Sequence, residues 1–161
     1  MNLVIVNRQR TKKIDTRRLK PIVGGLFAEL KLTEAELGIN LVGEREMALV
    51  NETFLQHEGS TDVITFDHTE NPGTHKATSP ALHGELFICV DDAIAQAREF
   101  KTSWQSEVVR YIVHGVLHLL GYDDLKPQLR RKMKQEENRL TRLLERKFSL
   151  AQIAARSKIS K

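Results

Sequence analysis

The segment from His114 to Asp124 constrains this chain more than any other part of its sequence. It reads His-Gly-Val-Leu-His-Leu-Leu-Gly-Tyr-Asp-Asp, so two histidines stand four residues apart. On a helix, this spacing places both imidazoles on one face, about one turn apart. Gly121 can end the helix in a left-handed turn, after which Asp124 can fold back toward the two rings. The segment therefore predicts a metal site formed by His114, His118 and Asp124.

Two imidazoles and one carboxylate suit zinc, and three protein ligands leave open the fourth coordination position that catalytic zinc sites use. The spacing resembles the H-E-x-x-H-x-x-G-x-x-H motif of the metzincin proteases, in which the Glu after the first His serves as the base. Here that position is Gly115, and the last ligand is Asp124 instead of His. We therefore expect one zinc ion per chain but no peptidase chemistry.

The same segment closely resembles the H-G-x-L-H-L-x-G-Y-D-H signature of the YbeY family, bacterial metal-dependent endoribonucleases of ribosomal RNA maturation and ribosome quality control. Three further stretches resemble motifs of this family in the same order: 49–54, 60–66 and 84–89. The resemblance implies a zinc-dependent endoribonuclease specific for single strands. Its implied partner is RNA, namely ribosomal RNA of the small ribosomal subunit.

Two residues depart from the family pattern. Asp124 stands where the signature has a third His, and Leu55 stands where the family has an Arg implicated in cleavage. Leucine cannot bind phosphate or offset charge in a transition state, so we expect weakened cleavage. The alternatives are a weak or inactive ribosome-assembly factor stabilised by zinc, or a metallohydrolase of another substrate. The general base stays unassigned, with Asp62 and His57 as candidates, and Asp123 is expected to cap the next helix or to support the site.

Charge is segregated along the chain, although the net charge is only +4. Residues 1–31 contain eight Lys or Arg against two acidic residues, and residues 126–161 contain twelve against three. The part between them has a net charge of −11. Basic segments that flank a metal-bearing centre suit a polyanion held by its backbone, although such runs are often only solvated helix faces. His68, His75 and His83 lie in or beside a polar stretch and are expected to be solvated.

Apolar segments of strand and helix length alternate along the chain, which predicts an α+β fold with a small mixed four-stranded sheet backed by about five helices. Residues 67–83 are rich in Thr, Pro, Gly, Ser and His and are expected to form a surface loop. The zinc site would lie at the end of a central buried helix. The expected strands are 3–6, 38–42, 63–66 and 86–90, and the expected helices are 15–31, 44–55, one that begins near 91, 104–120 and 128–148.

A single domain over residues 1–150 is expected, followed by a basic, frayed C-terminal tail at 151–161. Cys89 is the only cysteine and lies in an apolar run, so we expect a buried, inert thiol. No apolar stretch approaches the roughly 20 residues of a membrane span, which favours the cytoplasm and no membrane partner. The sequence leaves the oligomeric state open.

Overall fold

The computed structural model describes residues 1–56, 61–69 and 81–155. Four strands form one mixed sheet in the order β1-β2-β4-β3, with β1, β2 and β4 parallel and β3 antiparallel to β4. Along β2, Ala35 and Leu37 are buried whereas Glu34 and Glu36 are exposed, so one face of the sheet meets the core. The strands are β1 (Asn2–Asn7), β2 (Glu34–Val42), β3 (Val63–Asp67) and β4 (Ala81–Cys89).

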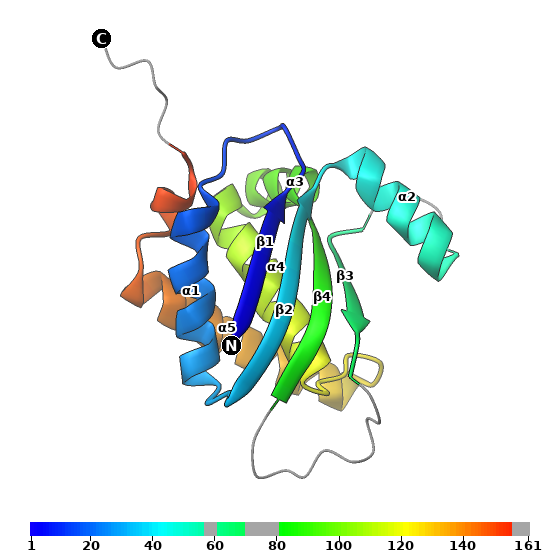
Figure 1. Cartoon of the computed structure of the whole chain (residues 1–161), viewed down its shortest axis with the longest axis vertical. Coiled ribbons are helices and arrows are strands. Elements are labelled where there is room, and N and C mark those ends of the chain that lie inside the picture. Colours follow the sequence, from blue (N-terminus) through cyan, green and yellow to red (C-terminus); the bar gives the residue numbers. More distant parts are fainter. Residues whose placement is uncertain (57–60, 70–80, 156–161) are drawn as a thin grey trace.

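Helices back one face of this sheet and leave much of the other face open (Figure 1). The longer helices form the core: α4 packs against β3, β4 and α5, while α1 packs against β1 and α5. The α+β fold and the small mixed sheet predicted from the sequence are confirmed. The helices are α1 (Thr16–Glu29), α2 (Glu44–Leu55), α3 (Val90–Phe100), α4 (Trp104–Leu119) and α5 (Pro127–Lys147).

Helix α4 is the buried centre of the molecule, as its apolar composition predicted. The Ser103 side chain accepts a hydrogen bond from the Ser106 amide and caps the first turn. Most of the following side chains are shielded from solvent, including a run at 2% exposure or less: Val108, Val109, Ile112, Val113, Val116 and Leu117. A helix so apolar is held in place by the sheet on one side and by α5 on the other.

Two glycines let α4 lie close to the sheet. A Cβ on Gly115 would stand 2.7 Å from Cδ2 of Leu86, and one on Gly84 would stand 2.7 Å from the main-chain oxygen of Phe66 and 2.8 Å from Leu119. Contacts that short require neighbouring atoms to move. Gly115 thus faces the sheet, so a side chain at the position after His114 would point into the core and away from the site.

Three predicted extents differ from the structure. Strand β2 begins at Glu34, before the expected start at 38, strand β4 begins at Ala81, inside the expected loop, and the C-terminal tail does not fray throughout. Residues Leu150–Ile153 form the 3-10 helix η2, Ile153 is fully buried, and Ala154 forms an isolated antiparallel bridge with Ile14. Burial of apolar side chains thus fixes the first residues of the tail against the rest of the protein. Residues 156–161 lie outside the described part of the chain.

A smaller cluster lies beneath α2. Val42, Met47, Val50, Ile64 and Cys89 bury against one another there, apart from the main core. Cys89 is fully buried, which confirms its expected place. None of the helices in the described part of the chain combines the length and apolar character that a membrane span requires.

Candidate metal centre

The end of α4 is closed by a turn that returns the chain toward the helix. Gly121 has a φ of +99°, in the region that favours glycine. Its amide donates to the His118 carbonyl at 3.0 Å, and the Tyr122 amide donates to the Leu117 carbonyl at 3.0 Å. These two bonds form a Schellman motif. The expected left-handed turn at Gly121 is confirmed, and it brings Asp124 beside the helix.

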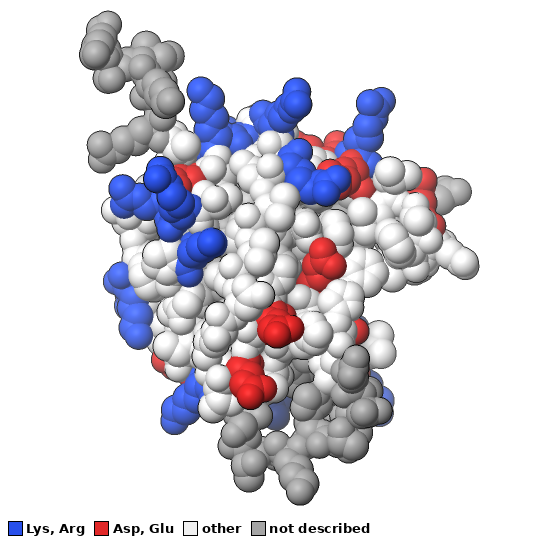
Figure 2. All heavy atoms as spheres, viewed as in Figure 1, with Lys and Arg blue, Asp and Glu red and all other residues white. Residues whose placement is uncertain are grey.

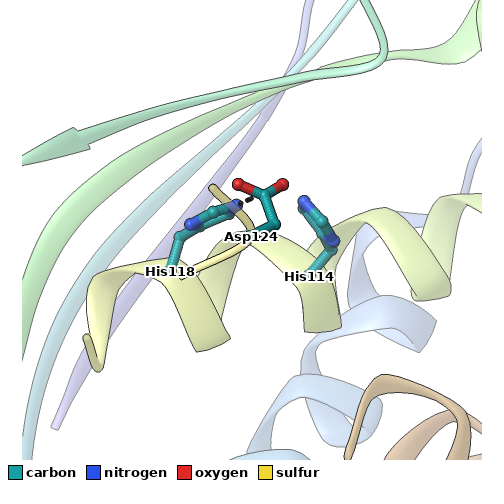
Figure 3. A group of neighbouring side chains, drawn as sticks. All are labelled: His114, His118 and Asp124. Carbon is teal, nitrogen blue, oxygen red and sulfur yellow. Dashed lines mark ion pairs between the residues drawn. The ribbon is translucent and has the colours of Figure 1, made fainter. Parts of the chain in front are cut away.

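The turn places Asp124 next to the two histidines of α4 (Figure 3). Nε2 of His118 lies 3.6 Å from Oδ2 of Asp124, and the centroids of the His114 and His118 rings are 4.7 Å apart. One ligand atom from each of the three residues lies within 4.8 Å of the others. Two imidazole nitrogens and a carboxylate oxygen form a donor set that fits zinc. The structure therefore brings the three residues into a group that could hold a metal ion.

Behind His114 lies Glu137 of α5, which the sequence analysis did not select. Its Oε1 is 2.6 Å from Nδ1 of His114, and its Oε2 is 2.9 Å from Arg110 and 3.0 Å from Lys134. Burial alone would raise the pKa of Glu137, but hydrogen bonds from His114, Lys134 and Arg110 together lower it to about 2. This carboxylate is therefore ionised at neutral pH.

A cavity of about 550 Å³ opens beside the metal-ligand group. Both His114 and Asp124 line it, and so does the candidate base Asp62. Three cationic side chains line it too, Arg110 from α4 and Arg130 and Lys134 from α5, together with the carboxylates Glu107 and Glu137. An anionic group placed there would lie near both the ligand group and these cations.

Tyr111 lies in the wall of this cavity, and its hydroxyl has no hydrogen-bond partner among the described residues. Burial and then the charges of Asp62 and Asp92 raise the pKa of Tyr111. The hydroxyl therefore stays protonated at neutral pH and cannot act as a base there. Asp62 is held differently, since its Oδ1 accepts a hydrogen bond from the Val63 amide at 2.8 Å.

The other candidate residues predicted from the sequence do not join the metal-ligand group. His57 lies outside the described residues. Leu55 ends α2, is 42% exposed, and is not among the described residues that line the cavity. Asp123 accepts a hydrogen bond from the Leu125 amide, so it stabilises the turn and does not cap α5. His68 and His83 lie beside β3 and in β4, where each pairs with a glutamate.

One signal in the sequence could have revealed Glu137. The buried residues of α5 recur at helical spacing, and Glu137 occupies the stripe otherwise formed by Met133, Leu140, Thr141 and Leu144. A carboxylate in such a stripe needs a buried partner. The sequence did not show that the partner is a metal-ligand candidate on another helix.

Charge is unevenly spread over the open face of the sheet. Lys and Arg side chains gather along its rim, over α1 and the segment that follows β1, whereas acidic side chains lie over its centre (Figure 2). The centre of this face would repel a polyanion. In the cavity, where carboxylates and cations are mixed, Arg110, Arg130 and Lys134 are the side chains that could contact one.

Comparison with known proteins gives consistent results. Residues 4–145 match the family model described as Endoribonuclease YbeY. An Endoribonuclease YbeY of Salinibacter ruber is 30% identical over 137 residues, covering 84% of this chain and 87% of that protein. One of Geobacter metallireducens is 32% identical over 148 residues, covering 91% and 97%. A solution structure from Thermotoga maritima has the same fold, with a TM-score of 0.67 at 20% identity and 99% coverage of both chains.

Proposed function

The chain belongs to the YbeY family of endoribonucleases, and from that premise we propose that it is a zinc-dependent endoribonuclease of single-stranded RNA. We place its action in the cytoplasm, on ribosomal RNA of the small ribosomal subunit during maturation and quality control. One observation carries the proposal: His114 and Asp124 share a cavity with Asp62 and with a wall of cationic side chains. A phosphodiester needs both kinds of group, because its charge must be held while a bond to phosphorus breaks.

The metal-ligand group and the cationic side chains of the cavity would have different roles. His114, His118 and Asp124 would hold zinc, which when bound supplies a Lewis acid beside the phosphodiester. Arg110 and Lys134 would hold the RNA backbone through its phosphate oxygens. Contacts to phosphate do not depend on which nucleobase the RNA carries. They therefore suit a nuclease with weak sequence specificity.

Asp62 is the proposed general base. Its carboxylate would accept the proton of the attacking hydroxyl, from water or the ribose 2′ position, as that oxygen bonds to phosphorus; the bond from phosphorus to the leaving ribose oxygen breaks, and this oxygen takes a proton from solvent. The hydrogen bond from the Val63 amide fixes the position of Asp62. Tyr111 would not take a proton, because its hydroxyl is buried and its pKa is raised. Arg130 donates from Nε to the main-chain oxygen of Asp124 at 3.1 Å and thereby steadies the turn that carries this ligand.

The main test is cleavage of labelled single-stranded and duplex RNA before and after zinc is removed with a chelator. We expect cleavage of the single strand, its loss with the metal, and its return with added zinc. Asp62→Asn should lower turnover by about 10²–10⁴-fold and leave RNA binding unchanged. Cleavage that ignores the chelator would contradict the proposal, and RNA binding without any cleavage would favour the assembly factor.

The cationic wall has a matched control on the same helix. Lys134 lines the cavity, whereas Lys132 is exposed and is not among the described residues that line it. Lys134→Gln should reduce the slope of log affinity against log salt by about one and weaken RNA binding, whereas Lys132→Gln should change both less. Equal effects of the two variants would indicate that RNA is attracted to the overall charge of α5 and does not bind in the cavity.

We further propose that Leu55 limits the rate of cleavage. Its 42% exposure leaves room for a longer side chain at the end of α2. Leu55→Arg should raise turnover at saturating RNA by about a hundredfold if the guanidinium reaches the phosphate. Tighter binding with unchanged turnover would show that the new charge contributes affinity alone.

A further inference from the structure

Glu137 is a carboxylate inside the buried stripe of α5, with 4% of its surface exposed, and its Oε2 pairs with Arg110 and Lys134. Removing a charge from water costs several kcal/mol unless partners replace the lost hydration. The partners come from two helices: Arg110 and His114 from α4, and Lys134 from the preceding turn of α5. The carboxylate thus joins α4 to α5 at the level of the metal-ligand group.

Further contacts hold this carboxylate in a defined position. Thr141 donates from its hydroxyl to the main-chain oxygen of Glu137 at 2.7 Å and is itself fully buried. Arg110 donates from Nη1 both to Oε2 of Glu137 and to Oδ1 of Asn138. With Oε2 engaged by the two cations, Oε1 lies opposite Nδ1 of His114 at 2.6 Å.

This arrangement determines which nitrogen of His114 carries the hydrogen. A carboxylate paired with two cations, here Arg110 and Lys134, can only accept a further hydrogen bond, so Nδ1 of His114 donates. In the neutral ring, Nε2 is then the atom with a free lone pair, and a metal ligand needs that lone pair. His118 differs from His114 in this respect: among the described residues its polar partner is Asp124, which is itself a candidate ligand.

We propose that Glu137 is the positioning residue of the metal centre, which it serves by fixing the His114 ring and its Nδ1–H tautomer so that Nε2 faces the metal. This inference rests on the metal site of the proposed function. Carboxylates that orient metal-bound histidines commonly change metal affinity by about 10–100-fold when they are mutated. Glu137 touches neither metal nor substrate and acts through His114.

The test compares Glu137→Gln with Glu136→Gln. Both variants remove one negative charge from adjacent positions of α5, but Glu136 pairs with Arg139 at the surface. Zinc affinity, measured by competition with a chromophoric chelator, should fall about 10–100-fold in Glu137→Gln and stay within about twofold in Glu136→Gln. Glu137→Asp, which keeps the charge but shortens the reach, should fall between them. Equal affinity in folded Glu137→Gln and parent protein would overturn the proposal.

A second readout needs neither zinc nor a stable variant. Imidazole ¹⁵N shifts of the metal-free parent protein, recorded with the rings neutral, should show His114 as the Nδ1–H tautomer. An Nε2–H tautomer would overturn the role of Glu137 even if no variant folds. If the parent protein binds no zinc but shows the Nδ1–H tautomer, the proposed metal-dependent function fails while the positioning of His114 by Glu137 stands.

Discussion

At the end of α4, His114, His118 and Asp124 bring one ligand atom each to within 4.8 Å of the others, whereas on the sheet His68 and His83 pair with separate carboxylates. Their partners, Glu85 and Glu36, each lie 3.4 Å from one imidazole. The side chains of His68 and His83 are 48% and 50% exposed, against 31% and 27% for His114 and His118. Both regions thus contain histidines and carboxylates. Only at the end of α4 do these side chains point toward one common position.

The difference lies in the scaffold beneath each pair of histidines. His68 and His83 stand opposite one another across two strands, where the His68 amide donates to the His83 carbonyl, and their rings are 5.8 Å apart. No buried group was found that orients them within the described part of the chain. His114 instead forms a hydrogen bond with Glu137, which is itself bound by Arg110 of α4 and Lys134 of α5. A buried second layer separates a candidate metal centre from a surface cluster of the same residue types.

The largest expected effect is on zinc binding. His118→Ala should reduce bound zinc from about one ion per chain to nearly none, with affinity at least about a hundredfold lower, because it removes one of three ligands. His83→Ala, on the sheet, should retain the metal. Zinc content after dialysis and the rise in unfolding temperature on zinc addition measure both effects. Equal zinc loss in the two variants would mean that the two regions do not differ as described.

A smaller effect is expected from paired glycine substitutions on the two faces of the sheet. A Cβ on Gly84 would meet the Phe66 carbonyl at 2.7 Å, so Gly84→Ala should lower the free energy of unfolding by about 1–3 kcal/mol. A Cβ on Gly38 would meet only the Glu85 side chain, at 3.4 Å or more. Gly38→Ala should be neutral or stabilising by up to about 1 kcal/mol. Urea unfolding tests the contrast, and a matching loss in both variants would refute it.

The smallest expected effect is a pH-dependent change at Asp92. Burial, followed by the charges of Asp62, Glu44 and Asp91, raises the pKa of Asp92. A raised pKa in the folded protein means that ionising Asp92 costs stability as the pH rises. Asp92→Asn should therefore unfold like the parent protein near pH 3 and be more stable than it at pH 7. Glu36→Gln, on the open face, should stay within about 0.5 kcal/mol throughout.

The Asp92 effect is best measured by urea unfolding in the presence of a chelator, so that metal binding does not contribute. A pH-independent difference between Asp92→Asn and the parent protein would show that some other property of the amide, and not the loss of the charge, changes stability.

The sequence predicted the features that are encoded locally. The spacing of His114 and His118 and the turn at Gly121 fall within one helical end, so the fold-back of Asp124 could be inferred before the structure was known. The contact between Glu137 and His114 could not be inferred, because it depends on how α5 packs against α4, and residue spacing carries no information about that packing.

The first residues of β4 were not predicted as strand, for a different reason. Its first residues alternate between the two faces: Leu82 is buried and His83 is exposed. Because the exposed face carries polar side chains, the alternation resembled the composition of a loop. In the tail, Leu150 and Ile153 are buried in the main core, but two apolar residues three positions apart are too few to predict a helix from periodicity.

The bridge between Ile14 and Ala154 bears on the order in which the chain can fold. It joins residues 140 positions apart, and the Asp15 amide donates to the Ile153 carbonyl beside it. Contacts between such distant parts of a chain form late, because the entropy of closing the loop must first be overcome. His114 to Asp124 span only a helix end and its turn. During synthesis, the chain should therefore be able to bring the proposed metal ligands together before the contact between its two ends forms.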